Sequence, residues 1–91
     1  MNSDVNKLLN SHNQLTHTND IKVESHVQRE QEDWYVNTIM LEGISTPFKY
    51  KRKRLYRSLK GNRVNITYYP TTENVAGIDI EVMNIVRIKI A

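Results

Sequence analysis

The sequence predicts a mostly β fold, a small barrel or half-barrel of five strands with one short helix, preceded by a flexible polar N-terminal arm. Three observations lead to this prediction. Apolar and polar residues alternate in RVNITYYP (residues 63–70) and again in IDIEVMNIVRIKI (residues 78–90), and a period of two is that of a half-buried strand. Glycine and proline punctuate the chain between such segments. Residues 1–33, in contrast, hold few side chains that could form a core.

Residues 1–33 are therefore predicted to be a mildly acidic, disordered arm, and residues 34–91 to be a small basic β-barrel domain. The arm carries three Lys or Arg against six Asp or Glu, whereas the domain carries ten against four. A segment with so little apolar surface to bury cannot offset the conformational entropy lost on folding. A helix over residues 5–15 could be capped by Asp4, but it would be too short to hold itself together in water.

The first two strands are expected in DWYVNTIMLEGISTPFKY (residues 33–50). They would be joined at Glu42-Gly43, where glycine can supply the positive φ of a tight hairpin. Pro47 has no N–H to donate to a ladder, which places the second strand at an edge or a bulge.

Alternation is lost in KRKRLYRSLKG (residues 51–61). Leu55 and Leu59 are four residues apart, and Gly61 stands where a helix would end in the left-handed conformation. This spacing predicts a short helix near residues 52–60 with both leucines facing inward.

Two further runs read as strands. The run over residues 63–69 is expected to end at Pro70, which would stop the ladder. The run over residues 78–90 places six apolar residues at even positions, but one straight strand of this length would span roughly 45 Å. A bend or bulge at Met83-Asn84 would let it serve two parts of a curled sheet. Five short strands with a connecting helix are typical of an OB-like or SH3-like barrel.

The sequence holds little that could support catalysis. It lacks cysteine, and its three histidines, all in the predicted arm, are spaced five and nine residues apart, unlike the ligands of a zinc site. The three glycines stand alone, without the spacing of a phosphate-binding loop. Asp79 and Glu81 would share a strand face, where alternating charge is usually solvated. We expect no enzymatic activity, no cofactor and no metal site.

No apolar run approaches the length of about 18 residues that a membrane-spanning helix needs, and the first residues resemble no secretory leader. We therefore expect no membrane partner and a cytoplasmic location. No pattern in the sequence indicates an oligomeric state.

Eight Lys and Arg fall within residues 49–63, with no acidic residue among them and with tyrosines interleaved. Cations neutralise phosphates and tyrosine rings stack on bases, so this pattern is typical of a surface for single-stranded DNA or RNA. The candidate nucleic-acid-binding residues are Lys49, Lys51, Arg52, Lys53, Arg54, Tyr56, Arg57, Lys60, Arg63 and Tyr69.

Two other interpretations of this basic stretch stay open. Small β domains often place Lys and Arg on an exposed edge strand to prevent edge-to-edge pairing. The chain could instead be an adaptor that docks an acidic partner protein through its basic helix or edge strand. Non-enzymatic contact with single-stranded nucleic acid or another polyanion is the favoured prediction, because aromatic residues accompany the cations.

Overall fold

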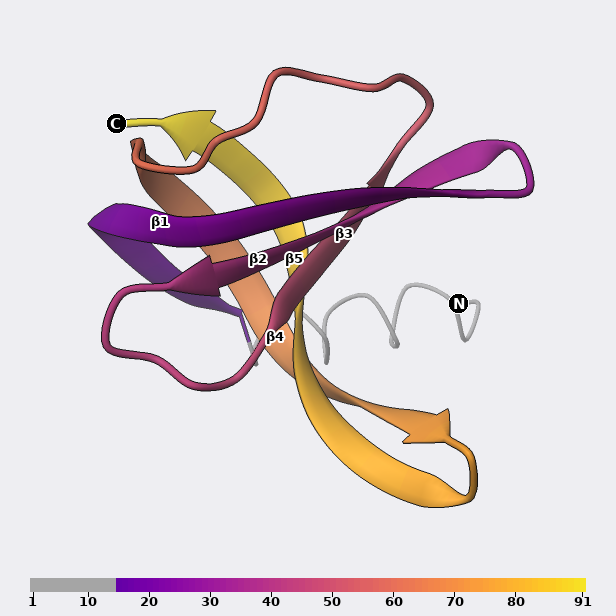
Figure 1. The fold of residues 1–91 in the computed structure, drawn as a ribbon. Helices are drawn as coiled ribbons and strands as arrows, with labels where there is room; N and C mark the ends of the chain where they lie inside the picture. Colours follow the sequence, from indigo (N-terminus) through magenta and orange to yellow (C-terminus); the bar gives the residue numbers. More distant parts are fainter. Residues whose placement is uncertain (1–14) are drawn as a thin grey trace, which may run out of the picture.

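The computed structural model describes residues 15–91, which form five strands and no helix. The strands close into a barrel in the order β1-β2-β3-β5-β4, with β4 returning to β1 (Figure 1). All neighbours are antiparallel except β3 and β5, which meet over a short parallel contact. The prediction of a mostly β, five-stranded barrel is confirmed. The strands are β1 (Thr16–Gln31), β2 (Trp34–Leu41), β3 (Phe48–Arg52), β4 (Arg63–Val75) and β5 (Ile78–Ile90).

β1 corrects the predicted domain boundary at residue 33. It pairs with β2 along one edge and with β4 along the other, so residues 16–31 belong to the barrel rather than to a disordered arm. The register of β1 shifts between Thr18 and Ile21 and again between Val23 and Ser25. These shifts change which residues face inward and hide the period of two from sequence inspection. Residues 1–14, and with them most of the predicted residue 5–15 helix, lie outside the described part of the chain.

The barrel interior is filled by apolar side chains from all five strands. Phe48 is 1% exposed, and its ring makes a T-shaped contact with that of Tyr68 at a centroid distance of 4.8 Å. Burying each large apolar side chain contributes roughly 1.5–3 kcal/mol, and this shared core holds the ring of strands closed. The core residues are Val23, Ile39, Leu41, Phe48, Tyr50, Val64, Ile66 and Ile85.

The short helix predicted near residues 52–60 is not formed. Residues 53–62 instead make an irregular connection from β3 to β4, the β3–β4 loop, which runs across the top of the view in Figure 1. The backbone N–H groups of Tyr56 and Leu59 donate to side chains of β1 rather than to carbonyls of a helical turn. Leu55, expected to face inward, is 62% exposed. Gly61 does adopt the positive φ expected of it, 86°.

β4 and β5 form a long hairpin that extends beyond the barrel, seen at the lower right of Figure 1. Pro70 does not end β4, because β4 pairs with β1 only as far as Tyr68 and an edge position tolerates the missing N–H. β5 carries an extra residue, Val86, opposite the step from Thr67 to Tyr68. A bulge is thus present, close to but not at the predicted Met83-Asn84.

Candidate functional site

Three residues of β1 hold the β3–β4 loop in place. The Gln28 amide pairs with the backbone of Tyr56: Nε2 donates to the carbonyl oxygen at 2.6 Å, and the Tyr56 N–H donates to Oε1 at 3.0 Å. The Leu59 N–H donates to Nδ1 of His26 at 2.8 Å. Nearer β4, the Gly61 N–H donates to the carbonyl of Val23 at 2.8 Å. The loop is therefore attached along its length although it has no regular structure.

His26 belongs to a buried polar network that begins at this loop. Since its Nδ1 accepts the Leu59 N–H, its proton lies on Nε2, which donates to Oδ1 of Asn37 at 2.7 Å. Asn37 is 1% exposed, and its Nδ2 donates to the carbonyl of Tyr35 at 3.2 Å. Both ring nitrogens of His26 are thus engaged within the protein. His26 positions the loop and has no nitrogen available for a ligand.

A pocket of about 170 Å³ lies between the loop, β1, β3 and the end of β5. Three cationic and two tyrosine residues line it, and no acidic residue is among its lining residues. The Arg52 guanidinium lies over the Tyr50 ring, 4.8 Å from its centroid. Burial raises the pKa of the Tyr50 phenol, and Arg52 opposes part of that rise. The pocket is lined by His26, Tyr50, Arg52, Tyr56, Arg57, Leu59, Ile88, Lys89 and Ile90.

A second cationic group lies beside Trp34, at the start of β2. The Nζ of Lys53 lies 4.0 Å from the centroid of the Trp34 ring, and this ring is 39% exposed. Lys51, exposed on β3, lines a shallow hollow with Trp34. Cation and indole are therefore together at the surface, where each can contact the same ligand.

Six of the ten predicted site residues carry positive charge within residues 51–60. In residues 15–91 none of the six forms an ion pair, and all but the half-exposed Arg52 are exposed. Tyr56, which lies within the same stretch, is 56% exposed. The structure thus gathers the middle of the predicted stretch onto the loop and the end of β3. The six are Lys51, Arg52, Lys53, Arg54, Arg57 and Lys60.

Lys49 and Tyr69, also predicted as site residues, contact the β4–β5 hairpin instead. Lys49 forms an ion pair with Glu73 at 2.7 Å. Tyr69 is half-buried, and its hydroxyl accepts a hydrogen bond from Nδ2 of Asn84 at 2.8 Å. Both residues help to join strands, and neither lies with the loop cations.

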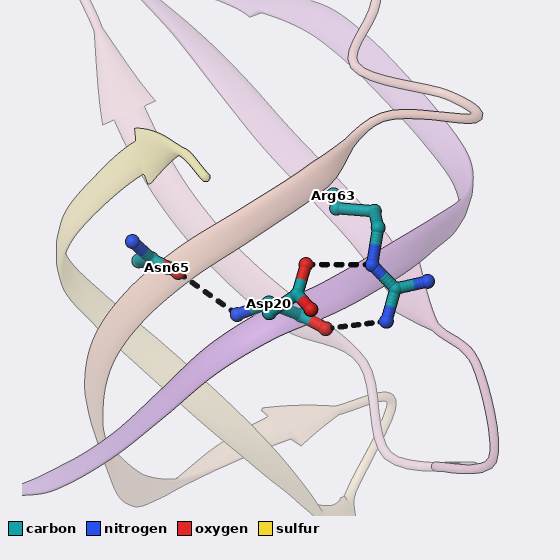
Figure 2. Close-up of polar contacts among 3 residues, drawn as sticks. All are labelled: Asp20, Arg63 and Asn65. Atoms are coloured by element: carbon teal, nitrogen blue, oxygen red, sulfur yellow. Dashed lines mark hydrogen bonds and ion pairs between the residues drawn. The ribbon is translucent and has the colours of Figure 1, made fainter.

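Arg63, the tenth predicted residue, binds the irregular part of β1 (Figure 2). Its Nε donates to Oδ1 of Asp20 at 2.6 Å and its second guanidinium nitrogen to the Asp20 carbonyl at 2.7 Å. Asn65 accepts the Asp20 N–H at 2.8 Å. Asp20 has a positive φ of 57°, a conformation that Asp adopts more readily than most residues. Arg63 and Asn65 thus stabilise the first register shift of β1.

Sequence inspection missed three contributors to this site. His26 and Gln28 lie in the segment predicted to be disordered, and Lys89 lies far along the chain from the basic stretch. The alternation of the run over residues 78–90 could have placed Lys89 on a solvent face. Nothing in the sequence could have placed it beside the loop, because that proximity depends on closure of the barrel.

A separate groove of about 430 Å³ runs between the outer face of β1 and β2 and the β4–β5 hairpin. It is mainly apolar, with Val27, Val75 and Ile80 at 46%, 50% and 40% exposure. Ile80 and Val82 of β5 line this groove, whereas Ile88, past the bulge, packs on the barrel core.

Over residues 15–91 no group of three or more His, Asp or Glu side chains could hold a metal ion. That part of the chain also has no helix long and apolar enough to cross a membrane. Comparisons of the chain with protein-family models, curated proteins and solved structures found no match.

Proposed function

We propose that this chain is a non-enzymatic binding module for single-stranded nucleic acid, and that the β3–β4 loop with the end of β3 forms its contact surface. One observation carries the proposal. Six cations within residues 51–60 form no ion pair in the described part of the chain, and they lie beside the exposed rings of Tyr56 and Trp34.

The chemistry of this surface suits a polyanion with aromatic groups. Lys and Arg that contact phosphates release condensed counterions, which supplies affinity without sequence preference. A base stacked on an aromatic ring adds about 1–3 kcal/mol. The side chains available for stacking are Tyr56 and Trp34, and neither is sealed in the core.

The closed order of the five strands, β1-β2-β3-β5-β4, is compatible with an OB-like barrel, although the β3–β4 connection holds no helix. In OB-like barrels the connection between the third and fourth strands usually carries a helix, and here that connection is the β3–β4 loop. OB-like barrels commonly bind oligonucleotides over strands 2 and 3, and Trp34 and Lys51 lie on β2 and β3. The cationic loop would extend that face toward the end of the barrel.

The test is fluorescence anisotropy of labelled single-stranded DNA and RNA oligonucleotides at several salt concentrations. For the triple variant Arg54→Gln/Arg57→Gln/Lys60→Gln we expect weaker binding. The slope of log affinity against log salt should fall by about 2, since each phosphate contact to a single strand contributes about 0.7. The matched control is Lys22→Gln/Arg29→Gln/Arg87→Gln, which removes three exposed cations outside the loop and should change the slope little.

Equal losses in the two variants would show that net charge, and not this surface, governs binding. Absence of binding to either oligonucleotide would overturn the proposal. Polyglutamate serves as a polyanion without rings. If it binds as tightly as the oligonucleotides, stacking contributes nothing, and the alternative of docking an acidic protein is favoured.

A further inference from the structure

We infer that the pocket beneath the β3–β4 loop holds one nucleotide, with its base against Tyr50 and Tyr56 and its phosphate on Arg52, Arg57 and Lys89. The inference rests on the proposed function in one respect: it places one nucleotide of a bound strand in this pocket. The same chemistry, an aromatic ring next to a phosphate, is also offered by a free nucleoside monophosphate.

The size of the pocket sets the first limit on its ligand. Its volume of about 170 Å³ is below the range of about 300–1,000 Å³ that is usual for drug-sized ligands. It therefore suits one ring system rather than several stacked bases. The apolar side chains of Leu59, Ile88 and Ile90 provide a surface on which such a ring can be desolvated.

The charges of the pocket set the second limit. Arg52, Arg57 and Lys89 line it, with no carboxylate among the lining residues, and Lys89 also lines a second hollow with Asn65 and Arg87. Arg57 and Lys89 make no side-chain hydrogen bond within residues 15–91, and Arg52 makes one, to the carbonyl of Lys51 at 3.0 Å. Most of their donors are therefore available, and a guanidinium can bind a phosphate through two parallel hydrogen bonds.

Tyr50 supplies the third feature. Tyr50 is 7% exposed and lines the pocket, and its hydroxyl forms no hydrogen bond with another described residue. A phenol can both donate and accept, so it can bind a polar atom on the edge of any base. A phenol that lines a pocket offers a bound ligand a polar partner.

The loop wall of the pocket is held rather than mobile in this structure. Gln28 fixes the backbone of Tyr56, and His26 fixes that of Leu59. A preformed pocket loses less entropy on binding than one that must first be assembled. Gln28 is accordingly a positioning residue for the site.

The experiment is an NMR titration of the ¹⁵N-labelled full chain with adenosine and uridine monophosphates, with the matching nucleosides and inorganic phosphate as separate arms. We expect shifts centred on the amides of Tyr50, Leu59 and Ile88. Binding should be weaker for nucleoside and for phosphate alone than for the monophosphate. The variants Tyr50→Phe and Lys89→Gln should each lower the affinity, Lys89→Gln by about tenfold. The control Lys22→Gln changes an exposed cation of β1 that does not line the pocket and should leave the affinity unchanged.

The same variants measured with the labelled oligonucleotides separate this inference from the proposed function. If oligonucleotides bind but Tyr50→Phe and Lys89→Gln change nothing, and monophosphates shift no pocket amide, the inference is overturned and the proposed function stands. If monophosphates shift the pocket amides but no strand binds, the pocket is a nucleotide site and the proposed function fails. If inorganic phosphate binds as tightly as the monophosphate, the base is not held and the inference is overturned.

Discussion

At the scale of single residues, Tyr50 couples the pocket to the stability of the barrel. Burial raises the pKa of its phenol above the ordinary value of 10.0, and Arg52 opposes part of the rise. The unfolded chain therefore releases this proton at a lower pH than the folded chain does. The stability that Tyr50 contributes is fully present below about pH 10 and is lost as pH rises through the folded-state pKa.

We expect Tyr50→Phe to reduce the alkaline loss of stability. The free energy of unfolding of the wild type should fall more steeply above about pH 10 than that of the variant, which has no phenol proton to release at this position. Urea unfolding at neutral pH and at several alkaline pH values measures the difference. The same substitution at the exposed Tyr56 is the matched control. Parallel pH profiles for wild type and Tyr50→Phe would contradict the prediction.

Residue types alone predicted a surface of cations and tyrosines, but they did not predict which cations belong to it. Lys49, Arg63 and Tyr69 find structural partners 24, 43 and 15 residues away in the chain. The sequence does not show which Lys or Arg side chains form an ion pair with an acidic residue in the folded chain. The interleaving of tyrosine with Lys and Arg remained informative, because Tyr56 has no place in the core.

At the scale of elements, the β3–β4 loop depends on one strand. A helix over residues 52–60 is consistent with the local spacing of leucines and glycine, yet the N–H groups of Tyr56 and Leu59 bind Gln28 and His26 instead. Those acceptors are 28 and 33 residues away in the chain. The helix propensity of this segment is overridden because tertiary hydrogen bonds give its backbone N–H groups partners other than helical carbonyls.

Replacing Gln28 by Ala should therefore loosen the loop without unfolding the barrel. Both hydrogen bonds to Tyr56 are lost, each worth about 0.5–1.5 kcal/mol, so the Tyr56 amide should exchange its hydrogen about tenfold faster or more. Amides within β4 and β5 should keep their protection. Hydrogen exchange followed by NMR measures both, with Gln31→Ala, at the exposed end of β1, as the control. Unchanged exchange at Tyr56 would show that Gln28 does not hold the loop.

β1 was missed by sequence inspection because of its two register shifts. Val23 and His26 both face the barrel interior or the pocket although they are three residues apart, which breaks the period of two. The other register shift, between Thr18 and Ile21, contains Asp20, which has a positive φ. Apart from Ile21 and Val27, the remaining positions are polar and most of them face solvent, so neither periodicity nor composition marks the strand.

At the scale of the whole molecule, the barrel needs β1 to close. β1 is the neighbour of both β2 and β4, and Val23 within it is fully buried. A fragment of residues 34–91 follows the boundary predicted from sequence but leaves two strand edges unpaired and the core open on one side. Unpaired edges and exposed core surface favour aggregation over folding.

We expect this fragment to show no cooperative thermal unfolding and poor amide dispersion in NMR spectra, whereas the full chain should show both cooperative unfolding and good dispersion. Adding a peptide of residues 15–33 in trans should restore dispersion in part, because the missing strand would again pair with β2 and β4. A well-dispersed spectrum from the fragment alone would contradict the role assigned to β1.

The sequence by itself determined the β class, the strands whose apolar residues alternate without interruption, and the collection of cations and tyrosines in one stretch. These are properties of neighbouring residues, and local periodicity and composition carry them. Only the tertiary structure decided that residues 16–31 close the barrel, that residues 53–62 form a loop rather than a helix, and that Lys89 joins Tyr50 and Arg57 around one pocket. The physical reason is the same in each case: hydrogen bonds and contacts between residues distant in the chain outweigh the preferences of a local segment.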